Sequence, residues 1–293
     1  TFVMPARNPE DEMTVQNTIE YENKFTIIDH PWRIFRENAD QLKRDFKLIT
    51  QGRKSVPITD KYTAVYGEEN IFVEEGVTIL AAVLNAESGP IYLGKNSIVQ
   101  EGVVIRGSFA LCENAQINMG AKLRGDTTVG PYSKVGGEVS NSVFFGNSNK
   151  SHDGYLGNSV IGEWCNLGAG TNCSNLKNNY ETVKLWSHTE NNFKNTGLQF
   201  CGLMMGDHSK SGISTMFNTG TVVDVCANIF GGGLPPTYIP SFAWGGANGF
   251  TRYKIEKALA TINKVMNRRN ADFSEDDKDI LLHLFKETFN SSV

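Results

Sequence analysis

An aliphatic residue recurs at every sixth position through the middle of the chain, and this spacing constrains the fold more than any other feature. The unbroken series contains Leu93, Val99, Ile105, Leu111, Ile117, Leu123, Val129 and Val135. A period of six matches neither the 3.6-residue turn of an α-helix nor the two-residue alternation of an ordinary β-strand. It is typical of a parallel β-helix, in which each hexad supplies one short strand and one turn.

The repeat predicts a prism of stacked coils, with one aliphatic side chain of each hexad pointing into the interior. Three hexads make a coil of about 18 residues, and coils stack at roughly 4.8 Å, the spacing between neighbouring strands. Two later runs continue the period, namely Tyr155, Ile161, Leu167 and Cys173, and then Phe217, Val223 and Ile229. A β-sandwich with accidental spacing is the alternative, and the unbroken first series argues against it.

Glycine and asparagine suit the corners of such a coil, because both tolerate a positive φ. The chain has 29 glycines and only 20% charged residues, which favours many regular turns over many surface helices. A net charge of −4 gives no electrostatic case for nucleic acid or an anionic membrane as a partner. No apolar run reaches the roughly 20 residues of a membrane span, so we expect no membrane partner.

Cysteine usage and the first residues both bear on location. The five cysteines show no C-x-x-C spacing, and the first residues lack the apolar core of a signal peptide. In a chain of this length the cysteines indicate reduced, buried thiols. We therefore expect a cytoplasmic protein.

The hexads divide the chain into three parts. Residues 1–65 contain none and are expected to be a linker or the remnant of an upstream domain, with one amphipathic helix over 32–46. Residues 66–246 form the predicted β-helix domain, which includes an irregular stretch at 175–200 that is expected to be functional or disordered. Residues 247–293 are expected to form two helices, 252–270 and 274–290, with a capping box at Ser274 and Asp277.

Histidine is the side chain best suited to acid–base chemistry near neutral pH, and the chain has five. No two of them show a metal-ligand spacing such as H-E-x-x-H, so a zinc hydratase is rejected. His152 stands out through its surroundings, the run N-K-S-H-D-G-Y-L-G-N-S-V-I-G-E-W-C-N-L-G-A-G-T-N-C-S-N over residues 149–175.

This run resembles the acetyltransferase domain of the bacterial bifunctional N-acetylglucosamine-1-phosphate uridylyltransferase/glucosamine-1-phosphate N-acetyltransferase family. In that family a catalytic histidine is followed by x-x-Y-L-G, by N-[IL]-G-A-G-T and by a C-N or similar pair, and all three follow His152 in order. The specific match covers residues 129–175, and a weaker hexad resemblance covers about 70–233. The whole chain resembles a divergent form of the family that lacks most of the uridylyltransferase domain.

The resemblance implies a left-handed β-helix, a homotrimer and acetyl-CoA as co-substrate. It also makes residues 1–65 the remnant of a nucleotidyltransferase-like domain. Mg²⁺ would matter only if such a domain exists, and acetyl transfer itself needs no metal. The site residues that the resemblance implies are His152, Glu138 and Asn166 for catalysis, Tyr155 and Asn175 for substrate binding, and Ala169 for acetyl-CoA. Gly170, next to Ala169, is also expected to bind acetyl-CoA.

The matched residues fit the chemistry of N-acetylation. An amino sugar is largely protonated near neutral pH, and His152 as a general base would free the amine to attack a thioester. Glu138 or Asp153 could orient the imidazole. A main-chain N–H near Ala169 or Gly170 could stabilise the tetrahedral oxyanion.

Two positions that contact the sugar phosphate in the family differ in this chain, where Asn118 stands for an arginine and Ser140 for a lysine. Lys134 and Lys150 are candidates to bind the substrate phosphate in their place. Lys210 is a candidate for the phosphates of CoA. For each lysine, a solvated surface position is the alternative.

The sequence therefore predicts an acetyl-CoA-dependent N-acetyltransferase that acts on an amino-sugar phosphate, with glucosamine 1-phosphate as the expected acceptor, in UDP-N-acetylglucosamine synthesis. Two alternatives stay open. One is a sugar-phosphate nucleotidyltransferase of which this β-helix is the oligomerisation part. The other is a non-catalytic trimeric scaffold.

Overall fold

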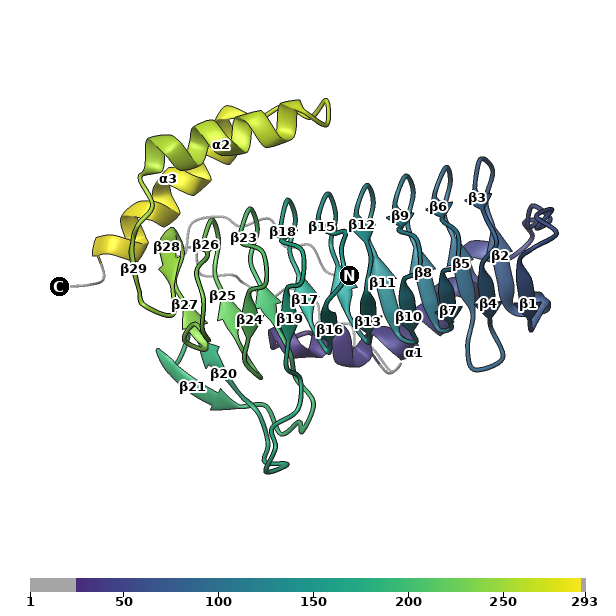
Figure 1. The fold of residues 1–293 in the computed structure, drawn as a ribbon, viewed down its shortest axis with the longest axis horizontal. Coiled ribbons are helices and arrows are strands. Elements are labelled where there is room, and N and C mark those ends of the chain that lie inside the picture. Colours follow the sequence, from purple (N-terminus) through teal and green to yellow (C-terminus); the bar gives the residue numbers. More distant parts are fainter. Residues whose placement is uncertain (1–24, 291–293) are drawn as a thin grey trace, which may run out of the picture.

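The chain forms a long parallel β-helix with one helix before it and two after it, as Figure 1 shows for the computed structural model, which describes residues 25–290. The helices are α1 (Pro31–Thr50), α2 (Ile255–Asn267) and α3 (Glu275–Asn290), with a short 3-10 turn η1 (Glu68–Asn70). The predicted parallel β-helix is confirmed. Its left-handed sense stays a prediction, because strand pairing alone does not define it.

Three sheets make the three sides of the prism. The first sheet contains β1 (Ala64–Tyr66), β4 (Val83–Asn85), β7 (Val104–Arg106), β10 (Lys122–Arg124), β13 (Glu138–Ser140) and β16 (Tyr155–Gly157). The second contains β2 (Ile71–Val73), β5 (Ile91–Leu93), β8 (Phe109–Leu111), β11 (Thr127–Val129), β14 (Val143–Phe144), β17 (Val160–Ile161), β22 (Met204–Met205), β25 (Val222–Val223) and β27 (Tyr238–Ile239).

The third sheet contains β3 (Thr78–Ile79), β6 (Ile98–Val99), β9 (Gln116–Ile117), β12 (Lys134–Val135), β15 (Asn149–Lys150), β18 (Asn166–Leu167), β23 (Lys210–Ser211), β26 (Asn228–Ile229), β28 (Ala243–Gly246) and β29 (Gly249–Arg252). Two strand pairs lie outside these sheets, namely β19 (Asn172–Cys173) with β24 (Met216–Phe217), and the antiparallel hairpin of β20 (Lys184–Ser187) with β21 (Asn192–Asn195).

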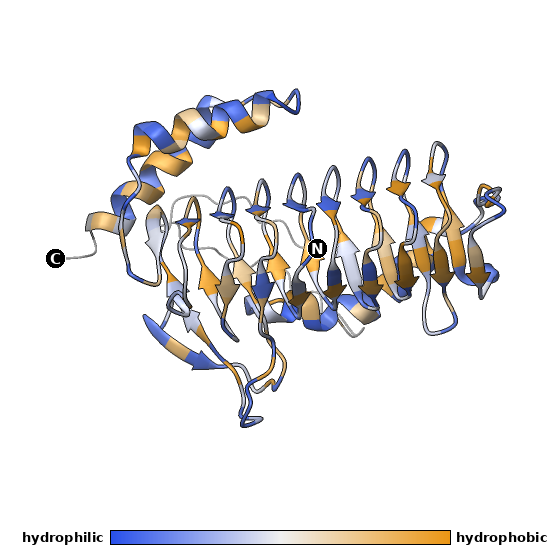
Figure 2. Ribbon diagram, in the orientation of Figure 1, coloured by the Kyte–Doolittle hydropathy of each residue, from blue (hydrophilic) through white to orange (hydrophobic). Residues whose placement is uncertain are grey.

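The aliphatic hexad residues fill the interior of the prism. All eight members of the unbroken series are at most 1% exposed, and Figure 2 shows apolar strand segments recurring along the prism. In the regular part Val99 pairs with Ile117, one 18-residue coil later. The second predicted run is wrong at its first member, because Tyr155 points outward and its neighbour Leu156 takes the inward position beside Val139.

The corners between the second and third sheets form a row in which one residue of each coil has a left-handed backbone, with φ between 52° and 60°. The row consists of Asn96, Asn114, Tyr132, Asn147, Trp164, His208, Cys226 and Phe242. Asparagine holds this place in the early coils, as predicted from its tolerance of positive φ. Bulky side chains take it in the later coils, although a left-handed backbone is unfavourable for them. We call these eight residues the corner row.

The bulky end of the corner row is where the C-terminal helices pack. Trp164, Cys226 and Phe242 share one apolar cluster with residues of α2 and α3, including Ala258 and Ile262. Burial of these side chains offsets the unfavourable backbone. Both predicted C-terminal helices are present, although α2 is shorter than expected.

The predicted capping box precedes α3. Ser274 Oγ accepts a hydrogen bond from the Asp277 N–H at 3.1 Å, and the Ser274 N–H donates to the Asp277 carboxylate at 3.2 Å. Two main-chain donors at the start of the helix are thereby satisfied. The reciprocal pair fixes where α3 begins after the turn that follows α2.

Helix α1 and the irregular stretch 175–200 both pack against the second sheet. Trp32 and Phe35 of α1 are buried in a cluster with Val183 and Leu185, which belong to the stretch that carries the β20–β21 hairpin. Asn38 accepts from the Thr128 hydroxyl at 3.0 Å and donates to a main-chain carbonyl of the prism. The stretch is therefore ordered, so of the two expectations for it, functional or disordered, disorder is wrong.

Gly130 tests how tightly successive coils are packed. A Cβ atom there would lie 1.9 Å from the Phe145 carbonyl oxygen, whereas a Cβ at Gly232 would meet nothing within 4 Å. We expect Gly130→Ala to lower the free energy of unfolding by at least about 2 kcal/mol, and Gly232→Ala to change it by less than about 0.5 kcal/mol. Urea denaturation of both variants measures this, and equal effects would contradict the packing.

Candidate functional site

His152 lies on the corner between the third and first sheets, in the turn from β15 to β16. Its side chain is exposed, and no described residue pairs with the imidazole. The next coil fixes this corner, because the Gly170 N–H donates to the Asp153 carbonyl at 3.0 Å. His152 therefore combines an accessible ring with a main chain held by its neighbours, as a general base requires.

A groove of about 620 Å³ runs from the His152 corner across the third sheet to the C-terminal end of α2. Its lining includes four cationic side chains, Lys134, Lys210, Arg268 and Arg269, and no carboxylate. Two of these cations come from the sheet and two from just beyond α2. With no carboxylate to neutralise them, the four side chains make the groove a place for a polyanion such as a phosphate-bearing ligand.

Arg269 fastens the end of α2 to the prism. It donates to the main-chain carbonyl of Tyr132 at 2.6 Å and to the side-chain oxygen of Asn149 at 2.8 Å. Tyr132 belongs to the corner row. The same row therefore packs against α2 and α3 at one end and binds Arg269 at Tyr132. Sequence reasoning missed Arg268 and Arg269, and the only signal was an Arg-Arg pair inside a predicted helix.

Lys150 does not take the place predicted for it. Its side chain occupies an inward hexad position next to Val135 and is 1% exposed. The ammonium donates to the main-chain carbonyls of Gly136 and His152, at 3.1 Å and 2.9 Å. Burial lowers the pKa of Lys150 to about 8. The prediction that Lys150 binds the substrate phosphate is wrong, because the amine points into the prism, where it holds the main chain of the His152 corner.

Three predicted residues gather on the first-sheet side of the corner. Glu138 and Tyr155 are neighbours on β13 and β16, and the Glu138 carboxylate lies 3.6 Å from Arg124. Asn175 donates to the Tyr155 hydroxyl at 2.9 Å and to the Asn158 side chain at 2.8 Å. Burial raises the pKa of Tyr155, so its hydroxyl keeps its proton. This side of the corner therefore offers an array of fixed polar groups.

The two residues predicted as oxyanion donors differ in their main-chain bonding. The Gly170 N–H is already used, since it donates to the Asp153 carbonyl. For the N–H of Ala169, residues 25–290 provide no acceptor. Gly170 is therefore wrong as the donor, while Ala169 stays a candidate. Asn166 lines the groove together with His152.

Lys210 lies deeper than an ordinary surface lysine. Its ammonium donates to the His208 carbonyl at 2.9 Å, and burial lowers its pKa. The His208 ring stacks parallel to Trp164, with 6.3 Å between the ring centroids. Lys210 still lines the groove, so its predicted contact with phosphate remains geometrically open.

Two other reactive side chains have no assigned role in the chemistry, namely Cys165, which lines the groove, and His188, which does not. Burial raises the pKa of the Cys165 thiol to about 12, which disfavours a nucleophilic thiolate. His188 Nε2 donates to the Asp224 carboxylate at 3.0 Å, a pair that sequence reasoning left unassigned. Within 25–290 no three His, Cys, Asp or Glu side chains are grouped so as to hold a metal ion. No helix in that part of the chain is long and apolar enough to cross a membrane.

Comparison with known proteins finds relatives of this chain. A family model described as a sugar nucleotidyl transferase matches residues 3–54. A bifunctional protein GlmU from Wolbachia pipientis is 30% identical over 163 residues, which cover 46% of this chain and 38% of that protein. A bifunctional sugar-1-phosphate nucleotidylyltransferase/acetyltransferase from Sulfurisphaera tokodaii is 28% identical over 218 residues, covering 74% of this chain and 47% of that protein.

The β-helix and these relatives fit a divergent, GlmU-like acetyltransferase half. The chain spans less than half the length of these two GlmU-like relatives. A solved UDP-N-acetylglucosamine acyltransferase from Francisella novicida aligns at 13% identity with a TM-score of 0.38, covering 78% of this chain and 91% of that one. At this score and identity, the alignment does not bear on the assignment of the GlmU-like chain.

The lowered pKa of His208 should make the free energy of unfolding depend on pH. Burial lowers its pKa to about 4, with a smaller contribution from Lys210, against about 6.5 for an unfolded histidine. Between these values the unfolded chain binds a proton that the folded chain does not, so stability falls as the pH drops through this window. We expect this histidine to cost about 2 to 3 kcal/mol of stability between pH 7 and pH 4.5.

The variant His208→Asn removes the titration and keeps a residue that tolerates the left-handed φ of 59°. Urea unfolding at pH 7 and pH 4.5 should show a smaller loss of stability for the variant than for the unmodified chain. The same loss in both chains would contradict the partly buried, neutral state of His208.

Proposed function

We propose that this chain is an acyltransferase of amino-sugar metabolism, which transfers an acetyl group from acetyl-CoA to the amine of an amino-sugar phosphate with His152 as general base. The name of the Sulfurisphaera tokodaii relative, a sugar-1-phosphate nucleotidylyltransferase/acetyltransferase, supports acetyl transfer in sugar-phosphate chemistry. Glucosamine 1-phosphate is the proposed acceptor, and the product would serve UDP-N-acetylglucosamine synthesis in the cytoplasm.

The observation that carries the proposal is the position of His152 at one end of a groove lined by cations. Coenzyme A bears several phosphates at one end and its thioester at the other. With the phosphates near Lys210, Arg268 and Arg269, the thioester could reach the corner at His152, because all four residues line one groove. Binding of the CoA phosphates by these cations would thus also point the thioester towards His152.

The acceptor would approach from the first-sheet side of the corner. Arg124, Tyr155 and Asn175 provide a cation and hydrogen-bonding groups there. The Arg124 charge is partly offset by Glu138 at 3.6 Å, and Lys134 in the groove is a second candidate for the sugar phosphate. In this arrangement His152 lies between donor and acceptor.

The reaction then needs few groups. His152 takes a proton from the sugar ammonium, and the neutral amine attacks the thioester carbon. The Ala169 N–H is the proposed donor to the oxyanion, and Asn166 is the proposed polar contact in the groove. When the tetrahedral intermediate collapses, the carbon–sulfur bond breaks, the nitrogen gives up its second proton as the amide forms, and the CoA thiolate takes up one proton. The proton that His152 accepted from the ammonium is released to solvent.

The first sheet supports the proposed homotrimer. Helix α1 packs on the second sheet and the C-terminal helices pack on the corner row, which leaves Tyr66 and Val104 of the first sheet 50% and 45% exposed. A further copy of the chain could cover this face and complete the acceptor side. Sedimentation analysis of the chain should give a trimer, and a monomer at micromolar concentration would contradict this part.

Sugar nucleotidyl transfer is a second candidate function, favoured by the family model that matches residues 3–54. In the described part of that range, α1 uses Trp32 and Phe35 to pack on the prism. Such an activity, with Mg²⁺, belongs to the proposal only for a longer protein that carries a nucleotidyltransferase domain. It would leave the acetyl-transfer test below unchanged.

Replacement of His152 tests the proposed general base. With acetyl-CoA and glucosamine 1-phosphate, release of free CoA should fall at least about 100-fold in His152→Asn. His283→Asn is the matched control, because His283 is exposed on α3 and lies 3.8 Å from Glu287. The control should keep full activity. No CoA release by the unmodified chain, or equal release by His152→Asn, would overturn the proposal.

A further inference from the structure

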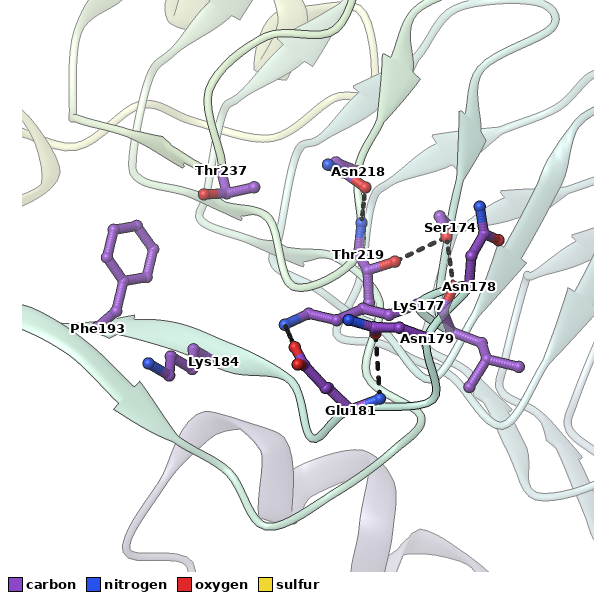
Figure 3. Close-up of a pocket in the computed structure, with 11 residues that line it drawn as sticks. Ser174, Lys177, Asn178, Asn179, Glu181, Lys184, Phe193, Asn218, Thr219 and Thr237 are labelled. Atoms are coloured by element: carbon purple, nitrogen blue, oxygen red, sulfur yellow. Dashed lines mark hydrogen bonds and ion pairs between the residues drawn. The ribbon is translucent and has the colours of Figure 1, made fainter.

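A second cavity of about 620 Å³ lies between the β20–β21 hairpin and the edge of the last coils (Figure 3). The hairpin side supplies Lys184 and Phe193, and the coil side supplies Asn218, Thr219 and Thr237. None of the residues assigned to acetyl transfer lines it. The irregular stretch 175–200 thus builds a cavity for which the proposed reaction has no use.

The lining of this cavity is rich in amides and hydroxyls and poor in net charge. Its polar uncharged members are Ser174, Asn178, Asn179, Asn218, Thr219 and Thr237. Lys177 lies 3.8 Å from Glu181, so Lys184 is the one lining cation without a carboxylate beside it among the described residues. The His152 groove, in contrast, has four cations and no carboxylate. The two cavities therefore suit different ligands.

Several polar side chains of the lining are fixed by hydrogen bonds within the protein and still have a donor or acceptor left for a ligand. The Asn218 side-chain oxygen accepts from the Thr219 N–H at 2.8 Å, and the Asn179 oxygen accepts from the Glu181 N–H at 3.2 Å. Both amides keep their NH₂ groups as donors. The Thr237 hydroxyl has no hydrogen-bond partner in the described part of the chain. The hydroxyls of Ser174 and Thr219 bond to each other at 2.7 Å, so Thr237 supplies the free hydroxyl. Fixed amides and a free hydroxyl match a ligand whose hydroxyls both donate and accept.

Phe193 adds an apolar surface to this polar cavity. The residue is 38% exposed, and Trp186 packs edge-on against its ring with 5.4 Å between the ring centroids. In Figure 3 the ring stands next to Thr237 at one end of the cavity. Aromatic rings pack against the C–H faces of a sugar ring, while neighbouring polar groups bind its hydroxyls. The lining contains no histidine, cysteine or aspartate, and its one carboxylate, Glu181, lies 3.8 Å from Lys177, so the cavity is suited to binding rather than to catalysis.

We propose that this cavity binds a neutral sugar unit, with Phe193 against the ring and Asn178, Asn218 and Thr237 at its hydroxyls. The hairpin would thereby give the chain a carbohydrate-binding site that is independent of the acyl-transfer corner. Because the lining is nearly neutral, bare phosphate should bind weakly or not at all.

Saturation-transfer NMR on the full chain tests this with the methyl glycosides of glucose, galactose and mannose, with N-acetylglucosamine, and with inorganic phosphate as the anion probe. At least one neutral sugar should bind saturably. Thr237→Val, which keeps the shape of the side chain, and Phe193→Ala should each weaken that binding at least about fivefold.

Two controls separate the site from its surroundings. Lys194→Met changes the next residue on β21, whose amine pairs with Glu190 at 2.5 Å outside the lining, and should leave binding unchanged. His152→Asn should also leave it unchanged, so that failure of the acyl-transfer proposal does not affect this result. The proposal would be overturned if none of the four sugars bound, if both cavity variants bound as tightly as the unmodified chain, or if inorganic phosphate competed with the sugar.

Discussion

The stacking of inward side chains, coil upon coil, is the constraint on which the rest of the structure depends. Each coil can bury its aliphatic residues only if they lie directly over those of the coil before, as Val99 lies beside Ile117. This alignment also brings the corners into rows. A residue at a corner therefore meets the same corner of the next coil, about 18 positions away in the regular coils and 44 away across the stretch 175–200, as for Trp164 and His208. A row of corners thus becomes a continuous surface along the prism.

The corner row uses this surface to carry the C-terminal helices. Where asparagine takes the left-handed position, the corner is a simple turn. Where Trp164, Cys226 and Phe242 take it, the corners instead form an apolar ridge under α2 and α3. The helices in turn bring Arg268 and Arg269 over the third sheet, and these arginines complete the groove that ends at His152. Packing of the helices on the corner row thus determines the positive charge of the groove on the third sheet.

The sequence predicted the interior well because the hexad period is local. It failed where the period changes, since Val135 pairs with Lys150 only 15 residues later. That shortening brings Lys150 inward, and a lysine at an inward position breaks the aliphatic pattern that would have revealed it. Leu156 lies inward only five residues before Ile161, so Tyr155, six before it, points outward. His152, Asn166 and Lys210 could be selected by motif or residue type, and the structure brings them to one groove. Arg269 could not, because its partner Tyr132 lies 137 residues away.

A crystal structure of the chain with bound CoA tests the central claim most directly. The account predicts that CoA lies in the groove, with phosphate oxygens within hydrogen-bond distance of Arg268, Arg269 or Lys210 and with the sulfur atom at the corner next to the His152 imidazole. CoA bound elsewhere on the chain, a sulfur atom remote from His152, or an empty groove at saturating CoA would contradict it.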